Sequence, residues 1–271
     1  MKRKIGILAL VVSVTIVLNF LFTKKISQWV ASARYETTHF TFYSSSGDLD
    51  LAKNLSTVVE KDYDRISKNY KTGINNKITV RIFTSRQLYN MAFGNPFPIP
   101  RKADNYDGQS TENTVYVLIP KTWQVLPDTI FPPERTRMLL SHEMAHSFVY
   151  QLNHNICGWL TEGIALYEQT PAFNETIRKA GFISWIESDV KKELIPKFSE
   201  LFNGKKITNP LITKDYVFAG SFVDFVTMKY GYDILIEFIK SLDFTKSFGK
   251  SESEVQNEWR KFLTDIYKTE R

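Results

Sequence analysis

Cysteine is almost absent from this chain of 271 residues, which contains Cys157 alone. A single cysteine excludes any disulfide bond within the chain, and no cysteine near the N-terminus is available for lipid attachment. A chain without disulfides does not belong among the small secreted modules that disulfides hold together. If it works outside the cell, the composition is more typical of a bacterial surface or secreted protein.

An excess of charge of one sign is missing from most of the chain. The formal net charge is +6, but residues 1–34 hold six basic residues and no acidic one. The remaining residues, 35–271, therefore contain 29 basic and 29 acidic side chains. A nucleic-acid-binding domain needs a basic surface, and this balance excludes nucleic acid as a predicted partner.

Long apolar runs are also missing, with one exception at the N-terminus. Residues 5–22 are uncharged and follow Lys2, Arg3 and Lys4. As a helix this run would be about 27 Å long, close to the thickness of the bilayer hydrocarbon. We expect a single-pass anchor in the cell membrane with the folded domain outside. The alternative is a cleaved signal peptide and a secreted protein, although the small residues at 31–33 lie far beyond the run.

The remaining chain shows no repeats and no low-complexity tract, and its pattern predicts an α+β fold. We expect strands at 39–43, 77–83 and 113–120, helices at 48–70 and 86–92, and a loop at 94–108. Asp48 should cap the first of these helices. From Pro132 onward the pattern is nearly all helical. The domain should therefore comprise residues 35–271, with an α/β half at 35–153 and a helical half at 154–271, after an N-terminal anchor and linker at 1–34.

Two of the four histidines lie in the segment SHEMAHSFV, within a predicted helix that begins near Pro132 and ends near Leu152. His142 and His146 are four residues apart, so both imidazoles project from the same helix face and can reach one ion. Glu143 lies one position round the helix, where it can reach a water molecule beside the ion. The alternative is a buried polar cluster of histidine and glutamate without a metal.

A catalytic zinc ion takes three protein ligands and keeps a fourth position open. The segment CGWLTEGIALYEQ follows the histidines and predicts a second helix that returns across the first. Glu162 lies in its first turns and is the predicted third ligand. Gly163 should allow the two helices to approach closely.

HEMAH followed by WLTEGIALY resembles the gluzincin metallopeptidases, whose pattern is H-E-x-x-H, a short gap, and then W-L-x-E-G-x-A. The resemblance is to the compact peptidase MA-like branch and, more distantly, to the M1 aminopeptidases, and it covers about residues 35–240. It implies a gluzincin-like fold of the thermolysin type and one zinc ion per chain. It also implies His142, His146 and Glu162 as zinc ligands and Glu143 as general base. Leu166 stands where thermolysin-type enzymes carry an aspartate that orients the first histidine.

Two further features follow from the resemblance. A tyrosine beyond the third ligand often stabilises the oxyanion in these families, and Tyr216 is our candidate, in a helix from about Thr213 to Gly231. The alternative is a tyrosine of the core with a satisfied hydroxyl. The strand at 113–120 takes the place of the edge strand that pairs with an extended substrate, or it is an ordinary strand of the sheet.

The sequence therefore predicts a membrane-anchored zinc metallopeptidase that acts on a peptide or protein substrate. One alternative is a non-catalytic surface module that contains zinc and binds peptide or cell-wall components. Glu143 disfavours this module, because binding alone requires no base. Another is a zinc hydrolase that acts on something other than peptides. The sequence gives no indication of the oligomeric state.

Overall fold

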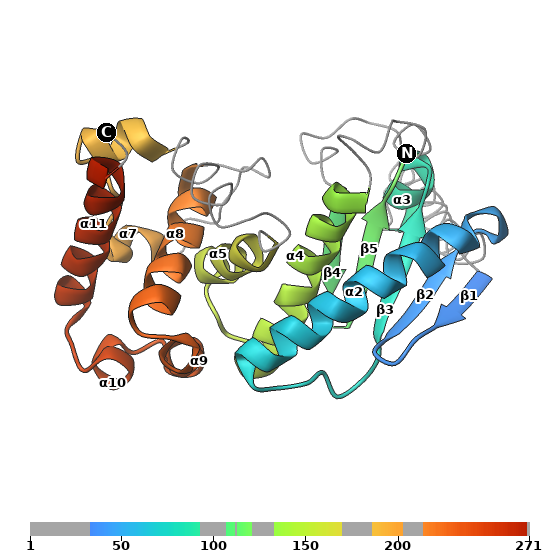
Figure 1. Cartoon of the computed structure of the whole chain (residues 1–271), viewed down its shortest axis with the longest axis horizontal. Coiled ribbons are helices and arrows are strands. Elements are labelled where there is room, and N and C mark those ends of the chain that lie inside the picture. Colours follow the sequence, from blue (N-terminus) through green and yellow to red (C-terminus); the bar gives the residue numbers. More distant parts are fainter. Residues whose placement is uncertain are drawn as a thin grey trace, which may run out of the picture.

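The structure is a computed structural model that describes residues 33–92, 107–111, 113–120, 133–169, 186–202 and 214–269. It has an α+β fold, in which a small mixed sheet with its helices forms one half and a group of helices forms the other (Figure 1). The predicted fold class is confirmed at this level.

The strands are β1 (Ala33–Glu36), β2 (Phe40–Ser44), β3 (Ile78–Phe83), β4 (Gly108–Thr111) and β5 (Thr114–Leu118). The helices of the sheet half are α2 (Leu49–Tyr70), α3 (Arg86–Ala92) and α4 (Pro133–Leu152). Those of the helical half are α5 (Gly158–Gln169), α7 (Phe198–Phe202), α8 (Lys214–Lys229), α9 (Tyr232–Ser241), α10 (Phe244–Phe248) and α11 (Glu252–Thr269).

The sheet has the strand order β1-β2-β3-β5-β4. Its three inner strands are parallel, and β1 and β4 lie antiparallel at the two edges. Parallel neighbours require a crossover, which α2 provides between β2 and β3. The arrangement leaves β4 as the outer strand on the side of α4 among the described residues.

Helices cover both faces of the sheet. The buried residues of α2 recur every three or four positions, so one stripe of the helix packs on the sheet beside α4. On the other face, α3 packs through Tyr89 against Phe83 and Leu118. The sheet half thus places α4 with one side on the sheet and another side free to meet the helical half.

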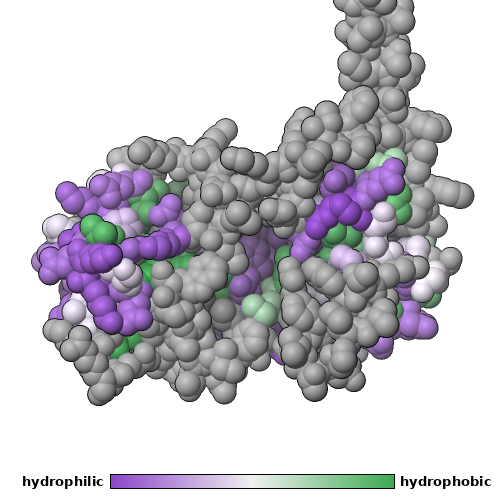
Figure 2. All heavy atoms as spheres, turned by 90° about the horizontal axis from the view of Figure 1, so that it is seen from above, coloured by the Kyte–Doolittle hydropathy of each residue, from purple (hydrophilic) through white to green (hydrophobic). Residues whose placement is uncertain are grey.

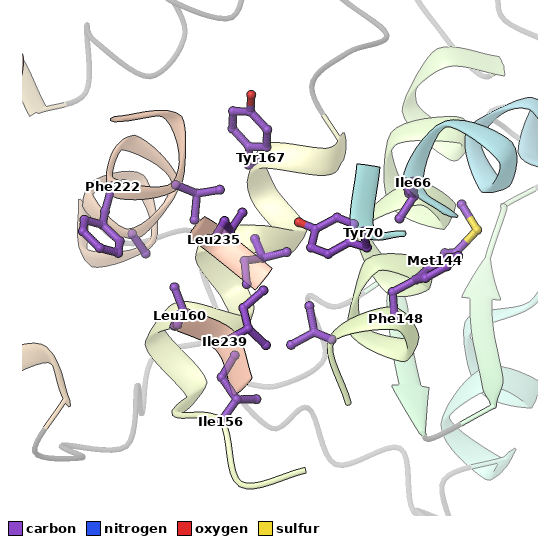
Figure 3. Packing of buried hydrophobic residues seen from close by; sticks show 14 of the residues in the cluster. Ile66, Tyr70, Met144, Phe148, Ile156, Leu160, Tyr167, Phe222, Leu235 and Ile239 are labelled. Atoms are coloured by element: carbon purple, nitrogen blue, oxygen red, sulfur yellow. The ribbon is translucent and has the colours of Figure 1, made fainter. Parts of the chain in front are cut away.

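The helical half is built around α8, whose residues from Val217 to Val226 are all buried. A helix that is buried all round must be central, and α8 packs against α5, α9 and α11. The core is continuous between the two halves, because α5 lies between α4 and α8 (Figure 1). Figure 3 shows this junction, where the labelled side chains are Ile66, Tyr70, Met144, Phe148, Ile156, Leu160, Tyr167, Phe222, Leu235 and Ile239.

Several sequence predictions need correction. The strand predicted at 113–120 corresponds to β5, which is an inner strand, so it is not the substrate-pairing edge that the resemblance implied. The edge is β4, which begins at Gly108, the residue where the predicted loop ends. The sequence pattern did not indicate a strand there. Residues 33 and 34, assigned to the linker, belong to β1. Asp48 precedes α2 but makes no side-chain capping bond, and its Oδ2 accepts hydrogen bonds from Ser45 and Thr84 instead.

The predicted N-terminal span, residues 5–22, lies outside the described residues. None of the helices in the part of the chain that the structure describes combines the length and the apolar character needed to cross a bilayer.

A glycine determines how closely α5 approaches α8. A Cβ atom on Gly163 would lie 2.7 Å from the carbonyl carbon and oxygen of Ala219. The indole Nε1 of Trp159 donates a hydrogen bond of 3.2 Å to the carbonyl of Asp215, one turn earlier on both helices. Gly163 was expected to allow close approach of α4 and α5, and this was wrong, because its close neighbour is α8.

We predict that Gly163→Ala destabilises the fold by about 1–3 kcal/mol, because the added methyl group must push two backbones apart. Urea unfolding of the full chain in excess chelator measures this free energy without any contribution from metal. Gly158→Ala is the matched control on the same helix, since a Cβ there meets nothing within 4 Å. It should leave stability unchanged or raise it by up to about 1 kcal/mol. Equal effects of the two substitutions would contradict the steric explanation.

Candidate metal centre

The predicted ligands converge where α5 crosses α4. Nε2 of His142 lies 3.4 Å from Oε2 of Glu162, and Nε2 of His146 lies 3.8 Å from the same oxygen. One ligand atom from each of the three residues can be chosen so that all lie within 4.8 Å of one another. The two histidines share a face of α4, and the return helix brings the carboxylate to that face. The structure therefore brings together the three side chains that the sequence singled out.

The distances from the two imidazoles to the carboxylate fit a zinc ion. Tetrahedral coordination with bonds of about 2.0–2.1 Å places neighbouring ligand atoms about 3.4 Å apart. The separation of 3.4 Å between His142 and Glu162 equals this value, and the 3.8 Å of His146 requires a shift of a few tenths of an ångström. Two imidazoles and one carboxylate are also a donor set that zinc prefers, and they leave one position open.

The orientation of His142 comes from a residue that the sequence analysis did not identify. Nδ1 of His142 lies 2.9 Å from the amide oxygen Oε1 of Gln169. An amide oxygen only accepts hydrogen bonds, so Nδ1 carries the proton of a neutral imidazole, which leaves the lone pair of Nε2 for an ion. Gln169 thus makes the contact with His142 that the resemblance assigned to an aspartate at the position of Leu166. The sequence could have indicated Gln169, because it lies two turns after Glu162 on the same face of the predicted helix.

The protonation of the cluster follows from burial and neighbouring charge. Burial opposes a charge on His142, but the hydrogen bond to Glu162 and the charge of Glu143 outweigh it and raise the pKa of His142. Burial, and then the charge of His142, lowers the pKa of His146 to about 4. Burial favours the neutral form of Glu162, yet the two histidines reverse this and lower its pKa. Without an ion, His146 is thus neutral at pH 7 and Glu162 is charged.

Glu143 lies between the ligands and the edge strand β4. Its side chain is almost fully buried, and burial raises its pKa above the ordinary value although His142 and Ser110 oppose the rise. Ser110 forms a hydrogen bond with its carboxylate, and a Cβ on Gly108 would lie 2.9 Å from Oε1 of Glu143. Both residues come from the same face of β4, whose strand character the sequence pattern did not reveal. A carboxylate with a raised pKa is better matched to proton transfer near neutral pH.

One tyrosine was predicted to belong to the site, and a different one contacts a candidate ligand. Tyr216 is half-buried in the first turn of α8, beside Asp215, whose carbonyl is bound by Trp159 of α5. Tyr150, which the sequence analysis did not consider, stacks its ring on that of His146 with centroids 6.2 Å apart. Burial, and then the charges of Glu162 and Glu143, raises the pKa of Tyr150. The sequence could have indicated Tyr150, because it lies one turn after His146 on the same helix face.

The region between the two halves exposes part of the cluster. Hydrophilic described residues are visible there when the molecule is seen from above (Figure 2). The three ligands are not fully enclosed, since the side chains of His142 and Glu162 are 18% and 28% exposed. An ion and a small substrate group can therefore reach the cluster.

None of the protein-family models matches this sequence, and no curated protein is significantly similar to it. Function must therefore be inferred from the geometry of the site and from the two motifs.

We predict that Gln169→Leu weakens zinc binding about 10–100-fold, because it removes the acceptor that orients His142. Gln169→Glu keeps an acceptor in the same place and should bind zinc at least as tightly as the unchanged chain. Competition with a chromophoric chelator measures both affinities. Unchanged affinity in the leucine variant would show that Gln169 does not orient the ligand.

Proposed function

We propose that the chain is a zinc-dependent metallopeptidase with one gluzincin-like catalytic domain. The observation that carries this proposal is the convergence of His142, His146 and Glu162, at ligand spacing, next to a buried Glu143. The motif resemblance supports the same conclusion, since its W-L-x-E-G-x-A segment supplies the carboxylate.

Each polar side chain then has a role in peptide hydrolysis. Bound zinc would supply a Lewis acid that lowers the pKa of water toward about 7. Glu143 removes a proton from the attacking water and transfers it to the leaving amine as the peptide bond breaks. Gln169 holds His142 in one tautomer throughout, so the site does not reorganise during the reaction.

A hydrogen-bond donor for the oxyanion completes this mechanism. Tyr216 remains our candidate, supported by its position in the first turn of α8 beside the bond from Trp159 to Asp215. Tyr150 is a second candidate, which its contact with His146 supports. Both phenols are half-buried and can donate one hydrogen bond.

The substrate class follows from the edge of the sheet. We propose that an extended peptide lies along β4 and forms main-chain hydrogen bonds with it. The contacts of Gly108 and Ser110 with Glu143 support this, because a strand there would carry its peptide bonds past the general base.

The location of the enzyme depends on residues outside the described part of the chain. We propose that residues 5–22 anchor it in the cell membrane, with the catalytic domain outside. This proposal is supported by the length of the apolar run and by the three basic residues before it. Secretion after cleavage of a signal peptide is the alternative.

We predict that Glu143→Gln keeps the zinc ion but loses at least about a hundredfold in turnover, as removal of a general base should. His146→Ala is the contrasting variant, since it removes a ligand and should release the metal. Elemental analysis of the purified proteins measures the zinc content of each. Digestion of a peptide library by the full chain, with cleavage sites mapped by mass spectrometry, measures turnover.

The same digest separates the alternatives. Cleavage that stops with chelator and resumes with zinc is expected of the peptidase. Zinc binding without cleavage of any peptide would favour the non-catalytic surface module or a hydrolase with another substrate. Peptide cleavage retained by Glu143→Gln would end the proposed mechanism.

We predict that Tyr216→Phe lowers kcat about 100-fold with little change in KM, because an oxyanion donor acts only in the transition state. Tyr150→Phe is the matched comparison, with the same chemical change on α4. A large loss of kcat in Tyr150→Phe alone would assign the donor to Tyr150. Near-normal kcat in Tyr216→Phe would remove Tyr216 from the mechanism.

A further inference from the structure

A chain of buried charges lies behind the metal ligands. Asp62 and Arg65 are one turn apart on α2, and neither takes part in the proposed chemistry. The carboxylate of Asp62 is 4% exposed, and that of Glu168 on α5 is fully buried. Charged groups are costly to bury, so this cluster calls for an explanation.

The first link joins α2 to α4. Arg137 donates two hydrogen bonds to Asp62, of 2.8 Å from Nε and 2.9 Å from Nη2. Ser141 donates a third, of 2.8 Å, to Oδ2 of the same carboxylate. Burial alone would raise the pKa of Asp62, but these bonds and the Arg137 charge lower it, so the group is charged at neutral pH. Ser141 immediately precedes His142, and this link therefore fixes the turn of α4 that carries the ligands.

The second link joins α2 to the end of α5. Nη1 of Arg65 forms an ion pair with Oε2 of Glu168, and Nη2 donates a bond of 2.9 Å to the main-chain carbonyl of Glu168. That carbonyl belongs to the last turn of α5, where carbonyl groups lack a partner within the helix. Burial raises the pKa of Glu168, and the charge of Arg65 opposes this rise. Tyr232 adds a bond of 3.3 Å to Oε1.

The two links and the candidate metal site together form a closed ring of contacts between α2, α4 and α5. Asp62 and Arg65 approach each other to 3.7 Å, so the links share one turn of α2. At their far ends stand Ser141, next to His142, and Glu168, next to Gln169. The bond between His142 and Gln169 closes the ring. The separation of α4 and α5 at the candidate ligands is thus determined both by their contacts with α2 and by the bond between His142 and Gln169.

We propose that Asp62, Arg65 and Glu168 are positioning residues that hold α4 and α5 at the separation needed for metal binding. This inference depends on the metal centre of the proposed function. Buried ion pairs contribute little net stability compared with apolar residues of the same size, so stability alone does not explain the cluster. The cluster contains two carboxylates and the guanidinium groups of Arg65 and Arg137. Its charges are therefore balanced, and it can remain buried when no metal ion is bound.

The test compares zinc affinity in Asp62→Asn and Glu168→Gln, which each remove one charge at nearly constant size. The full chain is titrated with zinc against a chromophoric chelator, at a temperature where circular dichroism shows every variant folded. Each substitution should weaken binding about 10–100-fold, the range expected when a group behind a metal ligand is lost. The double variant should lose little more than either single one, because one broken link already frees the helices.

Two controls separate positioning from a general loss of stability. Val255→Ala opens a cavity at a fully buried site on α11, which packs on α8. Glu258→Gln removes a carboxylate that pairs with Lys229 and Lys250, away from the ligands. Both should bind zinc within about twofold of the unchanged chain. Equal losses of affinity in the controls, or unchanged affinity in Asp62→Asn and Glu168→Gln, would overturn the proposal.

Milder variants serve if the charge variants do not fold. Ser141→Ala removes one bond to Asp62, and Tyr232→Phe removes one bond to Glu168. Each should weaken zinc binding severalfold, and unchanged affinity in both would overturn the proposal. The readout is independent of turnover: a chain that binds zinc but cleaves no peptide refutes the proposed function alone. A chain that binds no zinc refutes both.

Discussion

The position of the third ligand depends on the close contact between Gly163 of α5 and Ala219 of α8. Neighbouring helical residues point about 100° apart, so a helix can press one residue against α8 while the preceding one faces α4. The absence of a side chain at Gly163 lets α5 lie close to the buried α8. Glu162 then faces the two histidines. The packing of the helical half therefore decides whether the carboxylate reaches the imidazoles.

Local geometry explains which parts of this site could be predicted from the sequence. Histidines four residues apart on a helix must share a face, whatever surrounds them. The same reasoning places Glu143 beside them. Glu162 required more than periodicity, and the resemblance of its segment to a known motif supplied it. The helix at 49–70 was also predictable, because its apolar residues recur every three or four positions. Beyond Pro132 the sequence predicted a nearly all-helical chain, without separate bounds for α7, α9, α10 and α11.

The parts that could not be predicted depend on contacts between distant segments. β1 and β4 are four residues each and lie at the edges of the sheet, so alternation of apolar residues is weak in both. The neighbour predicted for Gly163 was wrong, because a glycine indicates close approach of two segments without identifying the second one. Asp48 precedes a helix in the usual capping position, yet its carboxylate accepts hydrogen bonds from Ser45 and Thr84 and none from the helix. Gln169 orients His142 only because the crossing of α4 and α5 brings them together.

The candidate ligands come from both halves of the molecule, since α4 packs on the sheet and α5 packs on α8. An ion held by all three would therefore tie the halves together, and only the folded chain could bind it. At a free zinc concentration a hundred times the dissociation constant, mass action alone would add about 2.7 kcal/mol to the free energy of unfolding. The melting temperature would then report the zinc available to the protein.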